Sequence, residues 1–401
     1  MTTALRNYLT ITGGYWAFTL TDGAIRMLVV LYFYQLGYSA FAVASLFLFY
    51  ELFGMLTNLV GGYLASRLGL NVTLHVGMGL QIIALSLLTA PDTVLTVAYV
   101  MFAQALSGIA KDLNKMSAKT CVKTLVSKNA DAQLFKWVAV LTGSKNTLKG
   151  VGFFLGAALL QWLGFRGALI TLALFLAIAL VITLYLLPSN LGKANVKPKF
   201  SQIFSQTAAI NWLSAARFFL FGARDVWFVV ALPVFLSGVL NWRFTDVGTF
   251  MALWVIGYGV VQASAPRLLK LDGNAPQGST ARNWSILLCL VPAIMALALT
   301  LGYPPQTTVI VGLAVFGIVF AINSAVHSYL ILAYASDDKV AMNVGFYYMA
   351  NAGGRLVGTL LSGWGYQQYG LTGCLWISTA FIAMAFCLSL PLANSQEKVA
   401  P

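Results

Sequence analysis

The sequence contains few charged residues and fewer acidic ones. Of its 401 residues, 9% are Asp, Glu, Lys or Arg and 59% are hydrophobic, whereas an ordinary soluble domain is roughly 25% charged. This composition excludes a water-soluble globular protein. Because a transmembrane helix needs about 20 apolar residues, the chain is long enough for twelve membrane crossings. We therefore predict an all-α integral membrane protein.

The sequence also lacks the motifs of catalytic and metal-binding sites. Its four cysteines are scattered without a Cys-x-x-Cys spacing, which indicates neither a disulfide framework nor a thiolate metal site. It has no G-x-x-x-x-G-K-S/T phosphate loop, no Gly-x-Ser-x-Gly elbow and no zinc-protease pattern. We predict no cofactor and no enzymatic activity, and we favour secondary transport over an ATP-driven process.

Apolar blocks separated by polar or Gly- and Pro-containing joints predict twelve spans. The longest polar stretch, 188–206, divides six spans from six. It predicts an N-terminal half (1–187), a cytoplasmic linker (188–206), a C-terminal half (207–392) and a cytoplasmic tail (393–401). The predicted spans are 8–34, 40–64, 73–89, 94–124, 134–163, 167–187, 209–236, 244–265, 283–301, 306–334, 341–366 and 371–391.

The basic residues in the loops and near the span ends are distributed unevenly between the two sides. Fourteen, Lys119 among them, fall on the side of the N-terminus, and only Arg166 and Arg243 fall on the other. Cytoplasmic loops carry such an excess of Lys and Arg, so we predict a bacterial inner-membrane protein with both termini cytoplasmic. The asymmetry accounts for part of the net charge of +13. We therefore expect membrane lipid as a partner and no nucleic acid. The first apolar run contains Asp22 and Arg26 and is too long for a cleavable signal peptide.

Three short motifs recur along the chain at offsets of 204 to 209 residues. NYL at position 7 recurs as NWL at 211, KGVG at 149 as RLVG at 355, and GI at 108 with Asn114 as GI at 317 with Asn323. This order indicates two homologous six-helix halves, the arrangement of the major facilitator superfamily. The stretch 62–69 resembles that superfamily's signature loop, although Ser66 stands where Asp is usual.

Eight basic residues lie away from the ends of the predicted spans. Each would cost about 2.5 to 3.5 kcal/mol at the centre of a lipid-facing helix, so we expect them to face the bundle interior. The acids at such positions number four, which leaves an excess of four positive charges and predicts a water-filled cavity for a multiply charged anion. The eight are Arg26, Lys111, Lys115, Lys145, Lys149, Arg217, Arg224 and Arg355.

Two sets of candidate site residues follow from these charges. The candidates for binding substrate are Arg26, Lys111, Lys115, Lys145, Lys149, Arg224 and Arg355. The candidates for a coupling or structural role are Asp22, Glu51, Asp112, Asp225, Asn323, His327 and Asn351.

Helical spacing groups some of these candidates on one helix face. Lys145, Lys149, Gly152 and Gly156 form one stripe, which Asn351, Arg355, Gly358 and Ser362 repeat. Polar residues followed by small ones predict a cavity wall that continues as a close helix contact.

Alternative interpretations remain open at this stage. Asp22 with Arg26, and Arg224 with Asp225, are also compatible with structural ion pairs. Lys111, Asp112 and Lys115 are compatible with a position near the cytoplasmic surface. An intramembrane enzyme acting on a phosphorylated lipid would also need cations in its spans, and a channel is a third possibility.

Three stretches carry a more specific resemblance: YWAFTLTDGAIR at 15–26, SGIAKDLNKMSAK at 107–119 and LTGSKNTLKGVG at 141–152. They resemble the ArsJ family of organoarsenical efflux permeases. The resemblance implies export of 1-arseno-3-phosphoglycerate, formed when glyceraldehyde-3-phosphate dehydrogenase uses arsenate in place of phosphate, and makes that enzyme a functional partner. We expect a monomer that confers arsenate resistance. An exchanger of organophosphates with inorganic phosphate is the alternative.

Overall fold

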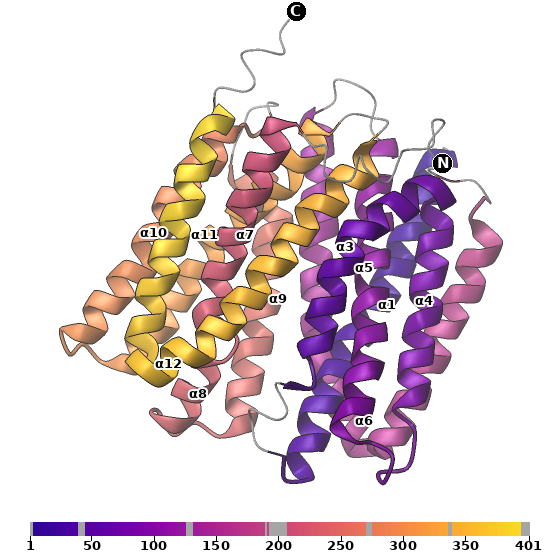
Figure 1. The fold of residues 1–401 in the computed structure, drawn as a ribbon, viewed down its shortest axis with the longest axis horizontal. Coiled ribbons are helices and arrows are strands. Elements are labelled where there is room, and N and C mark those ends of the chain that lie inside the picture. The colour runs from indigo at the N-terminus through magenta and orange to yellow at the C-terminus, as the bar shows by residue number, and fades with distance from the viewer. Residues whose placement is uncertain are drawn as a thin grey trace, which may run out of the picture. The chain divides into compact units, whose positions relative to one another are not determined.

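The computed structural model describes residues 3–38, 45–125, 131–188, 191, 207–269, 275–335 and 339–393. Within these ranges the chain folds into helices joined by short turns (Figure 1). The helices are α1 (Thr3–Gln35), α3 (Leu48–Leu68), α4 (Leu70–Leu87), α5 (Val97–Leu125), α6 (Asp131–Leu186), α7 (Ala208–Phe228), α8 (Ala231–Gly238), α9 (Phe244–Leu268), α10 (Gly278–Thr300), α11 (Pro305–Tyr334) and α12 (Val340–Ala393).

The helices follow the predicted spans closely. In the described part of the chain, eight helical segments are long and apolar enough to cross a membrane. Two of them, α6 and α12, are 56 and 54 residues long and each covers two predicted spans. The second and fourth predicted spans correspond to α3 and α5, and α3 contains a shorter apolar segment at Leu48–Gly61. The predicted all-α membrane fold is therefore confirmed.

A single glycine interrupts each of the two long helices. Gly164 in α6 has φ 66° and ψ 177°, and Gly370 in α12 has φ 66° and ψ −166°, a region that essentially only glycine occupies. No neighbouring atom lies within 4 Å of a Cβ built at either position, so the backbone angles rather than the available space require glycine. Figure 1 shows the chain of α12 turning back between its two parts.

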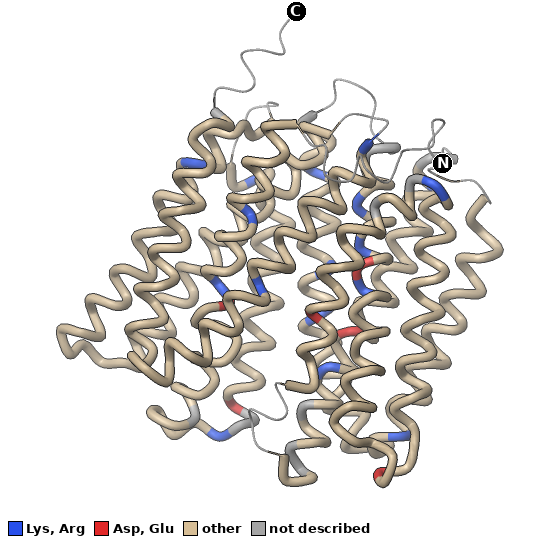
Figure 2. Tube along the Cα trace, in the orientation of Figure 1, with Lys and Arg blue, Asp and Glu red and all other residues tan. Residues whose placement is uncertain are grey.

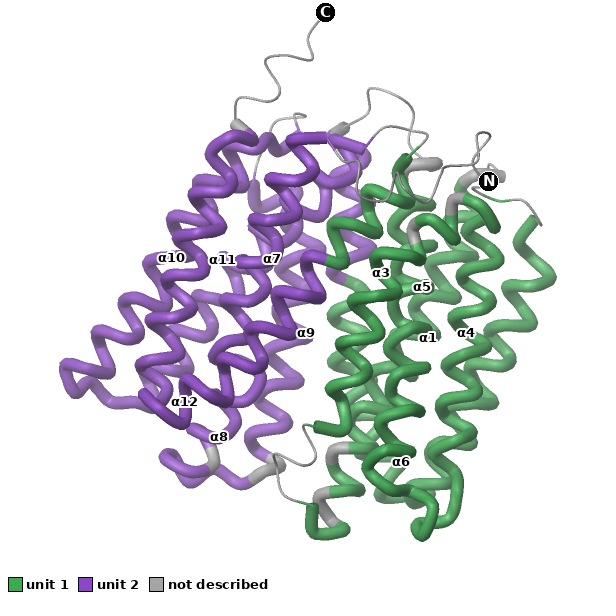
Figure 3. The backbone as a smooth tube through the Cα atoms, in the orientation of Figure 1, with its two compact units in different colours: residues 1–129, 144–205, 336–349 green, residues 130–143, 206–335, 350–401 purple. Residues whose placement is uncertain are grey.

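The chain divides into two compact units (Figure 3). Unit 1 comprises Met1–Asn129, Ser144–Ser205 and Ser336–Met349, and unit 2 comprises Ala130–Gly143, Gln206–Ala335 and Ala350–Pro401. The first residues of α6 thus belong to unit 2 and those of α12 to unit 1. Apart from Pro188, Leu191 and Ala393, the predicted linker and tail lie outside the described residues, and the division at 188–206 stays a prediction.

The seventh predicted span differs from the expectation because it consists of two helices. α7 ends at Phe228 and α8 begins at Ala231. The freed backbone N–H of Ala231 donates to Ser362 Oγ of α12 at 3.0 Å, so the break is compensated by a side chain from another helix of unit 2. Ser362 is the last residue of the stripe that the sequence predicts on this helix.

Candidate functional site

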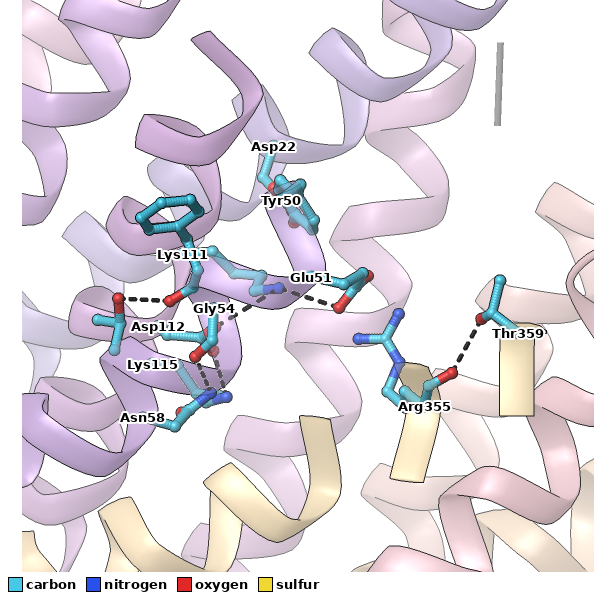
Figure 4. A network of polar contacts seen from close by, with 12 residues as sticks. Asp22, Tyr50, Glu51, Gly54, Asn58, Lys111, Asp112, Lys115, Arg355 and Thr359 are labelled. Atoms are coloured by element: carbon cyan, nitrogen blue, oxygen red, sulfur yellow. Dashed lines mark hydrogen bonds and ion pairs between the residues drawn. The ribbon is translucent and has the colours of Figure 1, made fainter. Parts of the chain in front are cut away.

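Charged residues lie partway along the helices as well as near their ends (Figure 2). In unit 1 they form what we call the N-terminal charged cluster, of which Figure 4 shows Asp22, Tyr50, Glu51, Lys111, Asp112 and Lys115. Its members are Asp22 and Arg26 of α1, Tyr50 and Glu51 of α3, Lys111, Asp112 and Lys115 of α5, and Lys149 of α6.

Asp22 divides its two carboxylate oxygens between two helices. Lys149 Nζ donates to Oδ2 at 3.1 Å, and the Tyr50 hydroxyl donates to Oδ1 at 2.5 Å. These contacts join α1 to α6 and to α3. A buried carboxylate is stable only when its oxygens are bonded in this way, so Asp22 is a structural centre of the cluster.

Glu51 and Asp112 hold the remaining cations of the cluster. Arg26 Nη2 lies 3.3 Å from Glu51 Oε1. Lys111 Nζ bridges the two acids, 3.6 Å from Glu51 Oε2 and 3.5 Å from Asp112 Oδ2. Lys115 pairs with Asp112 Oδ1. The absence of a side chain at position 54 makes this possible, because a Cβ built on Gly54 would lie 2.5 Å from Asp112 Oδ2.

Aromatic rings hold three of the cations in addition. Lys111 Nζ lies 4.0 Å from the centroid of the Tyr50 ring, and Arg26 Cζ lies 4.8 Å from the same centroid. Lys115 Nζ lies 4.3 Å from the centroid of the Tyr348 ring. Cation–π contacts of this kind orient a cation without neutralising its charge, so the cluster keeps its positive character.

In unit 2, what we call the C-terminal charged cluster is built around one fully buried acid, Asp225 of α7. Its Oδ1 accepts from Arg224 at 2.6 Å and its Oδ2 accepts from Arg355 of α12 at 3.0 Å. The Phe221 ring contacts two guanidiniums, with Arg217 Cζ at 3.8 Å and Arg224 Cζ at 5.0 Å from its centroid. Two arginines therefore share a single carboxylate.

The two clusters repeat one arrangement. Lys149 and Arg355 are equivalent positions of the internal repeat, and each pairs with an aspartate of the first helix of its half. The helices approach closely one turn further on, where a Cβ on Gly152 would lie 2.6 Å from Leu20 O and a Cβ on Gly358 would lie 2.5 Å from Gly222 O. The close helix contact that the small-residue stripes predict is confirmed in both units.

The cations of the clusters are more accessible than the acids. Side chains of the six paired cations are 14% to 25% exposed, whereas those of Asp22, Asp112 and Asp225 are at most 4% exposed. Four cations share three acids in one cluster and two share one acid in the other. The buried acids hold these partly exposed cations in place through charge-assisted hydrogen bonds and ion pairs.

The other predicted residues lie apart from these contacts. Lys145 is half-buried and donates to Asn146 Oδ1 at 3.1 Å. Asn323 donates to Ser285 Oγ at 3.0 Å, as expected of a structural residue. His327 is fully buried, with no hydrogen-bond partner at either ring nitrogen, and Asn351 is buried.

Sequence reasoning missed Tyr50. Tyr50 stands next to Glu51 in an apolar span, a position typical of packing aromatics, and only its partners reveal its role. Lys119, which the sequence places among the cytoplasmic cations, lies near the end of α5, and its side chain is buried at 3% exposure.

Comparison with known proteins agrees with this architecture. The sequence pattern described as Major Facilitator Superfamily matches residues 11–279. No curated relative matches the sequence. Several solved structures share the fold over 96% to 98% of this chain.

One is the human organic anion transporter MFSD10 (TETRAN), with a TM-score of 0.78, 17% identity and coverage of 97% of this chain and 100% of that one. Another is a bacterial homologue of the iron transporter ferroportin, with a TM-score of 0.75, 15% identity and coverage of 98% and 100%. A third is the fucose:proton symporter FucP of E. coli, with a TM-score of 0.71, 12% identity and coverage of 97% and 98%. At these identities the likeness establishes the fold. Because the pattern covers well over half of the chain, the protein belongs to the major facilitator superfamily and is a multi-pass membrane protein with a transporter fold.

Proposed function

We propose that this protein exports a multivalent phosphorylated organic anion, 1-arseno-3-phosphoglycerate, across the bacterial inner membrane by alternating access. The observation that carries the proposal is the excess of partly exposed cations over acids in both clusters, four cations to three acids in one and two cations to one acid in the other. Such a surface attracts an anion and offers little to a neutral or cationic solute.

The cation types suit a tetrahedral oxyanion. Arg355 and Arg224 offer planar guanidiniums that bind two oxygens at once, and Lys149 acts as a compact point charge. Phosphate and arsenate groups have the same tetrahedral shape and charge. We propose that Arg26, Lys111, Lys115 and Lys145 add to the positive potential, and that Asp22, Glu51 and Asp112 are the candidates for coupling to protons.

The proposed substrate follows from the resemblance to the ArsJ family. Glyceraldehyde-3-phosphate dehydrogenase would supply it inside the cell, and its breakdown outside would keep the gradient directed outward. Arsenite is a poor alternative, because trivalent arsenic prefers thiolates and the four cysteines lie outside both charged clusters.

Uptake into everted membrane vesicles tests the proposal. One reaction contains arsenate alone, and the other contains arsenate, glyceraldehyde-3-phosphate, its dehydrogenase and NAD. We expect arsenic to accumulate only in the second reaction and only with the wild-type chain. Equal accumulation from arsenate alone would contradict the proposal and indicate a simple oxyanion carrier.

A phosphate-coupled exchanger of ordinary organophosphates is the second candidate. The clusters support it because their contacts recognise charge and shape, which phosphate and arsenate share. In the same vesicles, 3-phosphoglycerate without arsenate distinguishes the two. Transport of radiolabelled 3-phosphoglycerate at the rate of the arsenylated compound would favour the exchanger.

A further inference from the structure

We infer that Asp22 is an internal counter-ion that the substrate displaces from Lys149, and that the Tyr50 hydroxyl holds Asp22 in place while Lys149 binds the substrate. This inference rests on the proposed function and describes how occupancy of the same site is regulated. It assigns Tyr50 as a positioning residue, which acts through Asp22.

The two oxygens of the Asp22 carboxylate have different partners. Lys149 occupies Oδ2 and Tyr50 occupies Oδ1, so Asp22 keeps a short hydrogen bond when Lys149 leaves. A buried carboxylate that lost every partner would carry a large desolvation penalty. The Tyr50 hydroxyl removes most of that penalty and makes the exchange feasible.

The backbone around Asp22 and Lys149 is fixed by close contact between α1 and α6. A Cβ built on Gly23 would lie 2.6 Å from the carbonyl oxygen of Lys149, and one on Gly152 would lie 3.0 Å from Gly23 Cα. With α1 and α6 in such close contact, the exchange needs movement of the Lys149 side chain alone. That side chain is 18% exposed and flexible, whereas Asp22 is 4% exposed.

Two further cations keep positive charge near Asp22 when Lys149 leaves it. Arg26 and Lys111 both lie over the Tyr50 ring whose hydroxyl bonds Asp22. These cations are themselves held by Glu51. Positive charge therefore stays near Asp22 after Lys149 has turned to the substrate, and the carboxylate remains available to recapture Lys149 on release.

The same division recurs at Asp225. Its Oδ2 takes Arg355, the repeat equivalent of Lys149, while its Oδ1 takes Arg224. A second partner thus holds the acid in both units, a tyrosine in one and an arginine in the other. This recurrence is what a shared exchange role predicts, since in each unit the acid keeps one partner when the other leaves.

Kinetics of the vesicle uptake, with the organoarsenical generated enzymatically, test the inference. In Asp22→Asn the substrate no longer competes with a carboxylate for Lys149, so the apparent KM should fall about tenfold, the value of one charge-assisted hydrogen bond regained. The maximal rate should fall as well, because nothing recaptures Lys149. An apparent KM that is unchanged or higher would overturn the inference.

Tyr50→Phe supplies a second, independent variant that removes only one hydroxyl. With Asp22 left to Lys149 alone, the apparent KM should rise severalfold, and this rise should vanish in the Asp22→Asn background because the two residues act through one contact. An apparent KM equal to that of the wild type, or an equal rise in both backgrounds, would overturn the assignment of Tyr50.

The chain offers a matched control in Asp92, an exposed acid that also accepts from a tyrosine and a cation, Tyr32 at 2.8 Å and Arg166 at 3.2 Å. Asp92→Asn should leave both kinetic constants at their wild-type values. The same measurements separate failure of the proposed function from failure of this inference. If wild-type uptake does not depend on the dehydrogenase, the proposed function fails. If wild-type uptake depends on the dehydrogenase but Asp22→Asn does not lower the apparent KM, only this inference fails.

Discussion

Lys149 and Arg355 occupy equivalent positions of the two repeats but differ in chemistry. Lys149 meets Asp22 through its ammonium group, whereas Arg355 meets Asp225 through the Nε of a planar guanidinium. We expect Lys149→Gln and Arg355→Gln each to lower uptake at least about tenfold, as loss of one charge-assisted hydrogen bond does. Arg355→Lys should recover less activity than Lys149→Arg, because lysine cannot bind two oxygens in one plane.

Initial rates in everted vesicles, divided by the amount of protein in the membrane, check this prediction. Arg166→Gln is the control, because Arg166 is an exposed cation in a pair with Asp92. Full activity in both Gln variants would remove Lys149 and Arg355 from the substrate path.

Arg217 is a cation of a different kind. Its side chain is nearly fully buried and donates to the carbonyl oxygen and hydroxyl of Ser324 at 3.3 and 3.2 Å. We predict that Arg217→Gln destabilises the protein by about 1.5 to 3 kcal/mol, the value of a hydrogen bond to a charged group. The apparent KM should stay at the wild-type value. Thermal unfolding of the purified protein in detergent, together with vesicle kinetics, would separate this structural role from one in binding.

At the residue scale, the sequence identifies most of the charges but not their partners. It shows that eight cations and four acids lie away from the ends of the spans, because charge within an apolar block is visible in one dimension. It does not show that Lys149 meets Asp22, which is 127 residues away. Helical spacing pairs Asp22 with Arg26, whereas in the structure Arg26 turns to Glu51. Partner choice depends on packing between helices, which spacing within one helix does not determine.

At the scale of the elements, helix contacts through glycine set the geometry of both clusters. We predict that Gly152→Ala and Gly358→Ala destabilise the protein by about 1 to 3 kcal/mol, as overpacking does, because each Cβ would meet a main-chain carbonyl. Gly363→Ala is the control on α12, where a Cβ meets nothing within 4 Å. Its stability should be unchanged or slightly higher, since alanine favours helix over glycine.

Unfolding temperatures of the three variants, measured side by side, test this prediction. We expect lower values for Gly152→Ala and Gly358→Ala than for Gly363→Ala. Equal stability of Gly152→Ala and Gly363→Ala would contradict the close approach of α1 and α6.

The sequence predicts most helix boundaries but not the break between α7 and α8. Long apolar blocks predict the spans well because membrane thickness fixes their length. The break between α7 and α8 is not predicted from the sequence because the residues on both sides of it are apolar. Ser362, which accepts the hydrogen bond of the freed Ala231 N–H, lies 131 residues away.

At the scale of the whole molecule, export and exchange differ in whether the transporter needs a return cargo. An exporter driven by the gradient of its own substrate needs no return cargo. We therefore predict that inorganic phosphate loaded inside everted vesicles does not accelerate uptake of the organoarsenical. Rates with and without 10-fold variation of internal phosphate check this, and strong acceleration would support the exchanger instead.

The overall fold is the part that the sequence predicts best, because composition, span length and internal repetition all bear on it. The match to the Major Facilitator Superfamily over residues 11–279 agrees with that prediction. The substrate depends on details of side-chain placement that the repeat does not constrain, since its two copies differ in their cations.

The glycines at 164 and 370 have a mechanical consequence for such a transporter. Each joins two helical stretches through one residue with no intervening loop. The two stretches therefore have little freedom to move relative to each other. They are therefore expected to move as one stiff hairpin whenever the protein changes conformation. Lys149 and Arg355 each lie on the first arm of such a hairpin, and any displacement of these cations would be transmitted at once to the second arm.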